Sequence, residues 1–331
     1  MTMDALKKIT SGQNLTSAEA QETMDAIMAG KFTDSQAGGL LIALKMKGET
    51  IEEITGFAKS MRNNAIKISP KVPRLVDTCG TGGDALGTFN ISTSAAIIAC
   101  ACGASVAKHG NRSASGSSGS ADVMEALGVK MLEPAKVEKC IESTGFGFMF
   151  ATLFHPAMKN VAHVRKELGV RTIFNLLGPL TNPAGAQTQL AGVFDKVAAQ
   201  KIANVLMSLG TEHALVVNSQ GMDEIGLGKT DIYEVRNGRL DTYTLDAKEL
   251  GFSVKEIPKA ASSMESAQII RDVLNGKQGA ARDVSIINAA AALYVSGKAK
   301  SIQSGIAVAQ NAIDSGKARD KLAQIAEFTG E

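Results

Sequence analysis

The stretch Asp77-Thr78-Cys79-Gly80-Thr81-Gly82-Gly83-Asp84 decides how the rest of the chain is interpreted. It follows Leu75-Val76, an apolar run typical of a short buried strand. Three glycines and a carboxylate after a strand let backbone N–H groups approach a ligand closely and point together at its phosphates. A tight turn alone needs only one or two glycines. We therefore expect a phosphate-binding loop at residues 80–84 within an α/β domain.

A dinucleotide fingerprint is the first alternative for this loop. Gly80-x-Gly82-x-x-Ala85 matches that motif weakly, because polar and glycine-rich sequence continues to Thr88 where a helix should begin. The next motif, Asn90-Ile91-Ser92-Thr93-Ser94, opens an expected helix at residues 95–102. Hydroxyl and amide side chains there add donors where a helix N-terminus already favours an anion. N-capping explains one such residue but not four, so we interpret the segment as a pyrophosphate cradle with a hydroxyl free for a metal.

Positive charge enters with Lys108-His109-Gly110-Asn111-Arg112-Ser113, after a predicted strand at residues 104–107. The donor-rich loop Ser115-Gly116-Ser117-Ser118-Gly119-Ser120 follows it. Lysine and arginine charges together with serine and glycine donors suit a multiply charged phosphosugar. A flexible linker is the alternative, but the basic motif and a predicted helix at residues 121–127 bracket the loop.

Further along the chain, Gly221-Met222-Asp223-Glu224-Ile225 places two carboxylates between small residues, just after a predicted strand at residues 214–218. Paired hard oxygen ligands suit Mg²⁺ shared with substrate phosphates. On its own such a pair is usually a solvated surface feature. Arg165, in a predicted helix, and Arg171 could each simply cap or salt-bridge a helix. His155 stands before that helix, and a lone histidine is more often structural than catalytic.

The segments around these motifs have a simple organisation. Thr16-x-x-Glu19, Thr33-x-x-Gln36 and Thr50-x-x-Glu53 are capping boxes that predict helices at residues 18–28, 35–46 and 51–65. Prolines at 70 and 73 end this helical region. Short apolar runs then predict strands at residues 75–76, 104–107, 129–132, 146–151, 188–193 and 214–218, with a helix at 197–209. Asn237-Gly238 predicts a type I′ hairpin, and the chain from residue 263 onward is expected to be mostly helical.

Composition excludes several functions. The chain has 331 residues, 44% of them hydrophobic, and its 35 Lys and Arg nearly balance 33 Asp and Glu, so no basic nucleic-acid face is expected. The longest apolar run, at residues 95–101, is far too short to span a bilayer. Four cysteines without a CxxC pair indicate no disulfide framework or zinc cluster. The first residues do not resemble a signal peptide. We expect a cytoplasmic globular protein.

Taken in order, the motifs resemble the anthranilate phosphoribosyltransferases. Three further segments carry this resemblance: Gly119-Ser120-Ala121-Asp122, His155-Pro156-Ala157-Met158 and Gly178-Pro179-Leu180-Thr181-Asn182-Pro183. The resemblance implies a small all-α N-terminal domain at residues 1–70, to which residues 160–182 return. It also implies a large α/β domain at residues 71–331 with a nucleoside phosphorylase/phosphoribosyltransferase-like fold, and a homodimer formed through the helical domain.

The activity implied by the resemblance is a magnesium-dependent step of tryptophan biosynthesis. The 5-phosphoribosyl group of phosphoribosyl pyrophosphate (PRPP) moves to the amino group of anthranilate, giving N-(5-phosphoribosyl)anthranilate and pyrophosphate. Mg²⁺ would be held by Ser92, Asp223 and Glu224. Anthranilate would be bound by Gly80, Asn111, Arg165, His155, Met158 and Gly178. PRPP would be bound by Gly80, Gly83, Asp84, Thr88, Asn90, Ile91, Ser92, Thr93, Lys108, His109, Gly110, Asn111, Arg112, Ser113, Ala114, Ser115, Gly116 and Ser120.

Two positions depart from the family pattern: Ser117, where a long or basic residue is common, and Thr152, where proline is common. They affect details of the PRPP loop and of the acceptor channel. No acid–base catalyst is expected, because an aromatic amine is already unprotonated near neutral pH; His109 is a candidate only for orienting that amine. The alternatives are a pyrimidine nucleoside phosphorylase-like enzyme and a non-catalytic relative that binds phosphosugars or nucleic acid.

Overall fold

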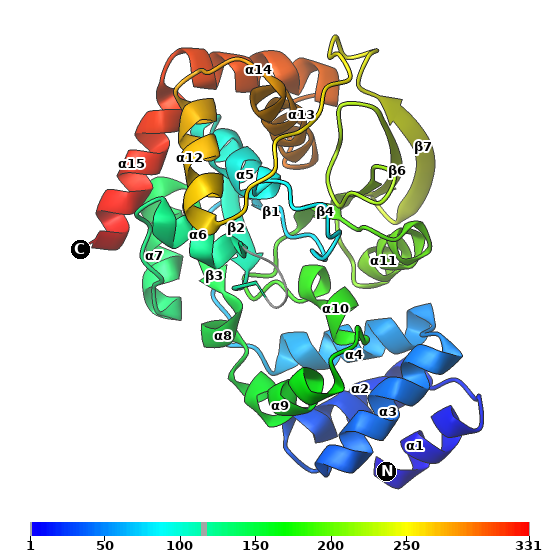
Figure 1. The fold of residues 1–331 in the computed structure, drawn as a ribbon. Coiled ribbons are helices and arrows are strands. Elements are labelled where there is room, and N and C mark those ends of the chain that lie inside the picture. The colour runs from blue at the N-terminus through cyan, green and yellow to red at the C-terminus, as the bar shows by residue number, and fades with distance from the viewer. Residues whose placement is uncertain (1, 114–117, 331) are drawn as a thin grey trace.

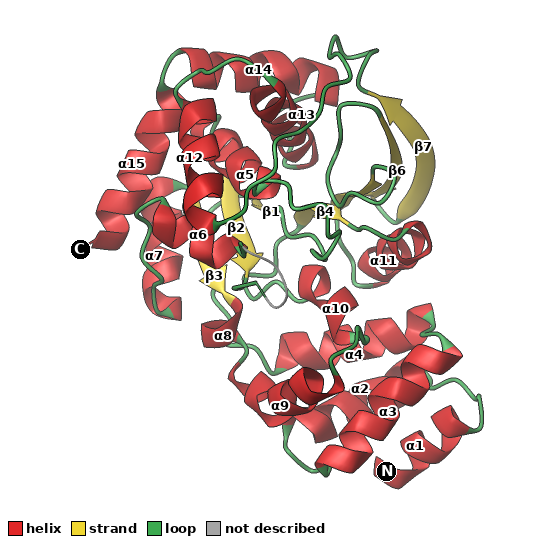
Figure 2. Cartoon of the chain, in the orientation of Figure 1, coloured by secondary structure: helices red, strands yellow, loops and turns green. Residues whose placement is uncertain are grey.

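The computed structural model describes residues 2–113 and 118–330. Figure 1 shows two regions, one built around a sheet and one at the N-terminal end that contains only helices. Figure 2 makes the same division visible by secondary structure, with all strands in the first region. Within the described ranges, no helix combines the length and apolar character needed to cross a bilayer.

The helical region contains α1 (Thr2–Thr10), α2 (Ser17–Met28), α3 (Asp34–Lys47) and α4 (Ile51–Asn63). Threonines at 16, 33 and 50 cap α2, α3 and α4, and all three capping boxes form as predicted. Helix α1 was not predicted, since it has no such signal. Later in the chain, α9 (Lys159–Leu168) packs against α2 and α3, and α10 (Phe174–Leu177) packs against α4. Residues 159–177 therefore return to the helical region.

The sheet has seven strands in the order β3-β2-β1-β4-β5-β6-β7. The first five strands in this order are parallel, and β6 and β7 are added antiparallel at one edge. Asn237 and Gly238 join β6 to β7 with φ angles of 50° and 75°, which confirms the predicted I′-type hairpin. The strands are β1 (Leu75–Asp77), β2 (Ser105–Gly110), β3 (Phe146–Phe150), β4 (Thr188–Gly192), β5 (His213–Asn218), β6 (Lys229–Arg236) and β7 (Arg239–Asp246).

Helices cover both faces of the sheet because strand side chains alternate between them. Leu190 and Leu215 enter one core with the helices of the C-terminal third, whereas Ala191 and Ala214 enter a second core that is continuous with the helical region. The remaining helical elements are α5 (Ile91–Ala101), α6 (Ser120–Ala126), α7 (Pro134–Thr144), α8 (Ala151–Phe154), η1 (Pro156–Met158), η2 (Gly178–Leu180), α11 (Lys196–Ser208), α12 (Ser263–Leu274), α13 (Ala280–Val295), α14 (Ile302–Asp314) and α15 (Lys317–Gly330).

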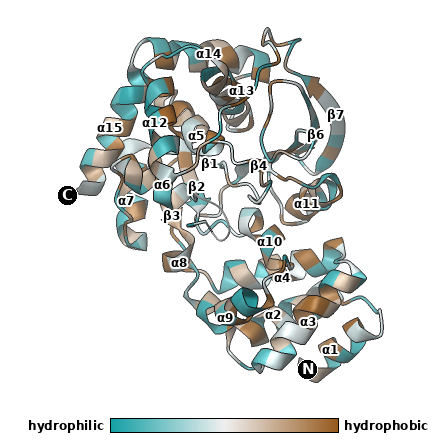
Figure 3. Ribbon diagram, in the orientation of Figure 1, coloured by the Kyte–Doolittle hydropathy of each residue, from teal (hydrophilic) through white to brown (hydrophobic). Residues whose placement is uncertain are grey.

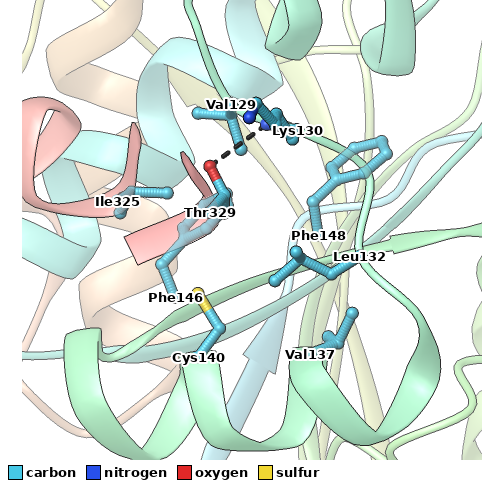
Figure 4. A pocket seen from close by; sticks show the side chains of 9 residues that line it. All are labelled: Val129, Lys130, Leu132, Val137, Cys140, Phe146, Phe148, Ile325 and Thr329. Atoms are coloured by element: carbon cyan, nitrogen blue, oxygen red, sulfur yellow. Dashed lines mark hydrogen bonds between the residues drawn. The ribbon is translucent and has the colours of Figure 1, made fainter. Parts of the chain in front are cut away.

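Two strand predictions need correction. Residues 129–132 form no strand: Val129 is buried in the core, and the Lys130 N–H donates to the Thr329 hydroxyl of α15 at 3.1 Å (Figure 4). The run is apolar because it packs beneath α15, where it lines a cavity of about 10 Å³, room for at most one water. The strand predicted at residues 146–151 ends at Phe150, because Ala151 already begins α8.

Candidate active site

The candidate site lies at the carboxyl ends of the parallel strands, the edge at which α/β sheets bind ligands. Strands β1, β2, β4 and β5 bring the glycine loop, the basic motif, Gly192 and the loop of Asp223 to this edge. Helix α10 lies between this edge and the helical region (Figure 1). Beside the ends of β4 and β5, a hollow of about 530 Å³ is lined by residues that include Phe194, Asn218 and Gly221.

Small residues let three chain segments approach one another here. A Cβ atom on Gly80 would lie 2.8 Å from the Gly192 carbonyl oxygen, and one on Gly192 would lie 1.5 Å from the Asp223 carbonyl oxygen. The Thr81 N–H donates to the same Gly192 oxygen at 2.8 Å. Gly83 has a φ angle of 80°, which favours glycine. The glycine loop is therefore seated directly against the carboxylate loop, and Gly192, which sequence reasoning missed, makes that approach possible.

The carboxyl groups of Asp84, Asp223 and Glu224 lie close enough to interact electrostatically. Burial raises the pKa of Asp223, and the neighbouring Asp84 carboxylate raises it further. Burial, followed by the charge of Asp223, likewise raises the pKa of Glu224. One buried oxygen of Asp84 has no hydrogen-bond partner among the described residues. Among the described residues no three Asp, Glu, His or Cys side chains are arranged to hold a metal ion by themselves. A cation shared with substrate phosphates would nevertheless relieve this repulsion, and hard oxygen donors of this kind suit Mg²⁺.

The first turn of α5 is hydrogen-bonded to one of these carboxyl groups. Glu224 Oε1 accepts the Ser92 N–H at 3.0 Å, which places a carboxylate at the positive end of the helix. The Lys108 ammonium is buried and donates to the Ser92 hydroxyl at 3.2 Å and to the hydroxyl and carbonyl of Thr78 at 3.1 Å. The structure thus brings Lys108, which was expected at the PRPP site, next to Ser92 and Glu224, which were expected together as metal ligands.

Asn90 is held from a distant part of the chain. Its side-chain Oδ1 accepts hydrogen bonds from the hydroxyls of Ser118 and Ser266, both at 2.9 Å, and its backbone N–H donates to Ser266 Oγ at 2.9 Å. Ser266 lies on α12, is fully buried, and was not singled out from the sequence. It fixes the orientation of a residue that the sequence assigned to the phosphate cradle.

Arg112 has protein partners that the sequence did not predict. Its guanidinium donates to Asp122 at 2.6 Å and to both oxygens of Glu125 at 2.7 Å, and it lies 5.5 Å from the ring centre of Phe150. Asp122 also accepts the Ser113 N–H at 3.3 Å. These contacts tie the basic motif to the first turns of α6. The expected contacts of Ala114, Ser115 and Gly116, and the departure at Ser117, lie outside the described residues.

Two histidines form a neutral pair. His109 Nδ1 lies 3.2 Å from the Gly178 carbonyl oxygen, which can only accept, so Nδ1 carries the proton. His109 Nε2 then accepts from His155 Nε2 at 3.2 Å. Burial lowers the pKa of His155 to about 4, and burial together with His155 lowers that of His109 to about 3. Both ring nitrogens of His109 are therefore engaged.

Beneath this pair, Asp77 is completely buried at the end of β1. It accepts the His109 N–H at 3.1 Å and the side-chain amide of Asn182 at 2.8 Å. Burial raises its pKa to about 6. Asp77 thus connects β1, β2 and the segment after η2 through buried hydrogen bonds.

The two arginines of the returning segment differ. Arg165 is half-buried, with its guanidinium 4.9 Å from the ring centre of Phe174, and it has no hydrogen-bond or ion-pair partner within residues 2–113 and 118–330. Arg171 donates to the Gly83 carbonyl oxygen and lies 4.0 Å from the ring centre of Phe194. Arg171 therefore links the helical region to the glycine loop, while Arg165 keeps a free positive charge that suits an anionic ligand.

Family models match nearly the whole chain. Residues 3–65 match the helical bundle domain of a glycosyl transferase family, and residues 72–319 match the α/β domain of that family. The anthranilate phosphoribosyltransferase of Acetivibrio thermocellus is 51% identical over 334 residues, covering 99% of this chain and 97% of that protein. The chain belongs to the anthranilate phosphoribosyltransferase family. This confirms the resemblance and the predicted fold class, an α/β domain preceded by a helical bundle.

Solved anthranilate phosphoribosyltransferases share this fold. The Thermus thermophilus structure superposes with a TM-score of 0.94 at 43% identity, covering 99% of this chain and 100% of that one. The Saccharomyces cerevisiae enzyme in complex with PRPP and Mg superposes with a TM-score of 0.91 at 27% identity, covering 99% and 98%. The same yeast enzyme in complex with 4-fluoroanthranilate gives 0.89 at 26% identity, covering 99% and 97%.

Proposed function

We propose that the chain transfers the 5-phosphoribosyl group of PRPP to the amino group of anthranilate, releasing pyrophosphate, as a step of tryptophan biosynthesis. The observation that carries this proposal is the convergence of the glycine loop, Lys108 and the carboxylate pair at one sheet edge, in a chain of this family. Mass spectrometry of a reaction with PRPP, Mg²⁺ and anthranilate tests it. N-(5-phosphoribosyl)anthranilate is the expected product; its absence while a pyrimidine nucleoside undergoes phosphorolysis would contradict the proposal.

PRPP would bind along the carboxyl ends of β1 and β2. Backbone N–H groups of the glycine loop and the buried Lys108 ammonium supply the positive potential that its phosphates need. Asn90, oriented by Ser266, would bind from the start of α5. Arg112 would act by holding α6 through its ion pairs with Asp122 and Glu125. The remaining proposed contacts are those of Gly80, Gly83, Asp84, Thr88, Ile91, Ser92, Thr93, His109 to Ser113, Ala114 to Gly116 and Ser120.

Magnesium would be held by Ser92, Asp223 and Glu224. Glu224 accepts the backbone N–H of Ser92, and Asp223 precedes it in the chain. Burial, followed by the neighbouring carboxylates, raises the pKa of both acids, and a cation would offset the charge among them. When bound, Mg²⁺ would neutralise charge on the pyrophosphate as it leaves. The yeast relative, whose structure contains PRPP and Mg, supports this proposal.

Anthranilate would approach from the helical region. Among the described residues Arg165 has no anionic partner, and its planar guanidinium matches a carboxylate with fixed geometry. Gly80, Asn111, His155, Met158 and Gly178 would line the remainder of the acceptor site. Thr152 is exposed on α8, and this chain would therefore differ from other family members, which commonly have proline here, in a detail of the acceptor channel.

During the reaction a bond forms between the anthranilate nitrogen and ribose C1 while the bond from C1 to the pyrophosphate oxygen breaks. The residues of this chain serve mainly to hold the two substrates in line and to stabilise the departing anion. His109 has no free ring nitrogen, because one donates to Gly178 and the other accepts from His155. We therefore assign it a positioning role, and the amine proton is released to solvent.

The active form would be a homodimer built through residues 1–65 and the returning segment. Helix α3 is hydrophobic around much of its surface (Figure 3): Leu40 and Leu44 are buried, whereas Met46 is 80% exposed. Met3 on α1 is also exposed. A second copy of this region would cover these side chains. All four cysteines are unpaired, which supports placement in the reducing cytoplasm.

A further inference from the structure

A buried asparagine on α13 reaches the backbone directly after the carboxylate pair. Asn288 Oδ1 accepts the Ile225 N–H at 3.0 Å, and Asn288 Nδ2 donates to the Ile225 carbonyl at 2.8 Å. The amide thereby pairs with both backbone groups of one residue, as a neighbouring strand would. A third hydrogen bond, from Nδ2 to the Val284 carbonyl at 2.8 Å, fixes the side chain on its own helix. Asn288 and Ile225 are both completely buried.

The carboxylate loop has two anchors, one on each side of Asp223 and Glu224. On the side of β5, Ser219 and Met222 exchange backbone hydrogen bonds at 3.0 Å. On the other side, Asn288 holds Ile225. The first anchor lies within the loop, whereas the second connects the loop backbone to a separate helix, α13. Asn288 therefore ties the backbone directly after the carboxylates to α13.

Helix α13 also packs along α5, whose first turn carries Ser92. Glu224 links the carboxylate loop to the same helix, because its Oε1 accepts the Ser92 N–H at 3.0 Å. The chain of contacts runs from α5 through Glu224, Ile225 and Asn288 to α13 and back to α5. These contacts restrain the spacing between the Ser92 hydroxyl on the helix and the two carboxylates in the loop. Metal sites depend on contacts of this kind, which hold the ligands in place.

We propose that Asn288 is a positioning residue for the divalent-metal site, holding Asp223 and Glu224 in binding geometry before metal or PRPP arrives. The inference rests on the proposed function for the identity of the metal site. Asparagine is suited to the role because it offers a donor and an acceptor side by side, whereas serine offers a single hydroxyl and alanine offers neither.

The test compares Asn288→Ala with Ser285→Ala on the same helix. Ser285 is also completely buried, but its hydroxyl has no partner among the described residues, so its removal controls for loss of a polar group from α13. Mg²⁺ is titrated calorimetrically into each full-length protein saturated with PRPP, without anthranilate. We expect the Mg²⁺ dissociation constant of Asn288→Ala to rise at least about tenfold, the usual cost of removing a residue that holds metal ligands in place. Ser285→Ala should stay within about twofold of wild type.

Three results would overturn the proposal: a folded Asn288→Ala protein with unchanged Mg²⁺ affinity, equal losses in the two variants, or an anthranilate KM that rises as much as the Mg²⁺ constant. If Asn288→Ala does not fold, Asn288→Ser replaces it and should show a smaller loss in the same direction. Hydrogen exchange on the wild-type protein, free of metal and PRPP, provides an independent check. The Ile225 amide should be strongly protected, and rapid exchange would refute the proposal that Asn288 holds Ile225 in place.

The same titration distinguishes failure of the metal site from failure of the positioning role of Asn288. A wild-type protein that binds no Mg²⁺ in the presence of PRPP contradicts the proposed metal site. In that case the exchange of the Ile225 amide still decides whether Asn288 holds the loop. Normal wild-type binding with no effect of Asn288→Ala contradicts only the positioning role.

Discussion

Replacing Arg165 by alanine should weaken anthranilate binding without unfolding the protein. The guanidinium is half-buried, burial lowers its pKa, and it has no ion-pair partner in the described part of the chain. Its contact with Phe174, worth roughly 0.5–1 kcal/mol, is the main protein interaction lost. A charged hydrogen bond to the anthranilate carboxylate contributes roughly 1.5–3 kcal/mol. Since about 1.4 kcal/mol corresponds to tenfold, the anthranilate KM should rise about ten- to hundredfold.

The assay is steady-state turnover with each substrate varied in turn, supported by calorimetric binding of PRPP. Lys166→Ala provides the matched control, since Lys166 is an exposed basic residue on the same helix. The PRPP KM should change little in either variant, because the phosphates are bound by other loops. If Arg165→Ala instead loses PRPP affinity and keeps its anthranilate KM, Arg165 belongs to the phosphosugar site and the acceptor has been placed incorrectly.

Four further outcomes follow from the site and the fold. Asp223→Asn combined with Glu224→Gln should reduce turnover sharply and abolish its dependence on Mg²⁺; full activity in EDTA would exclude the metal assignment. Gly192→Ala should destabilise the protein by at least the roughly 1–3 kcal/mol of an overpacked core in urea unfolding, because its methyl group would overlap the Asp223 carbonyl; a neutral result would show that the loops do not meet there. Burial holds the folded-state pKa of His155 at about 4, below its unfolded value, so acidification from pH 6 to 4 lowers the free energy of unfolding. The free energy of unfolding of His155→Gln should fall by up to about 1.4 kcal/mol less per pH unit over this range. Equal slopes of unfolding free energy against pH in the variant and the wild type would contradict this. Sedimentation at micromolar concentration should give a dimer, and an active monomer would refute the interface at residues 1–65.

Local signals predicted local structure well. The threonine caps of α2, α3 and α4 and the turn at Asn237 depend on a few neighbouring residues, and each formed as expected. The apolar run at residues 129–132 misled because burial beneath a helix and burial in a sheet produce the same short pattern. Helix α15, which decides between them, lies almost 200 residues further along the chain.

The motifs also identified the residues that converge at the site, but not the residues that hold them in place. Ser266 lies 176 positions from Asn90, and Asn288 lies 63 positions from Ile225. Such pairs follow from the packing of helices on the sheet and leave no mark in the spacing of the sequence. A weak signal did exist for Asn288, a lone amide within the apolar run Ile286-Ile287-Asn288-Ala289-Ala290.

We propose that one sheet edge brings PRPP and anthranilate together with the help of a divalent metal. The most direct test is a continuous recording of anthranilate fluorescence with the purified full-length protein, together with a count of pyrophosphate released. Fluorescence should fall only when PRPP, anthranilate and Mg²⁺ are all present, with one pyrophosphate formed for each anthranilate consumed and with the reaction stopped by EDTA. Pyrophosphate release without loss of anthranilate, or an unchanged rate in EDTA, would contradict the claim.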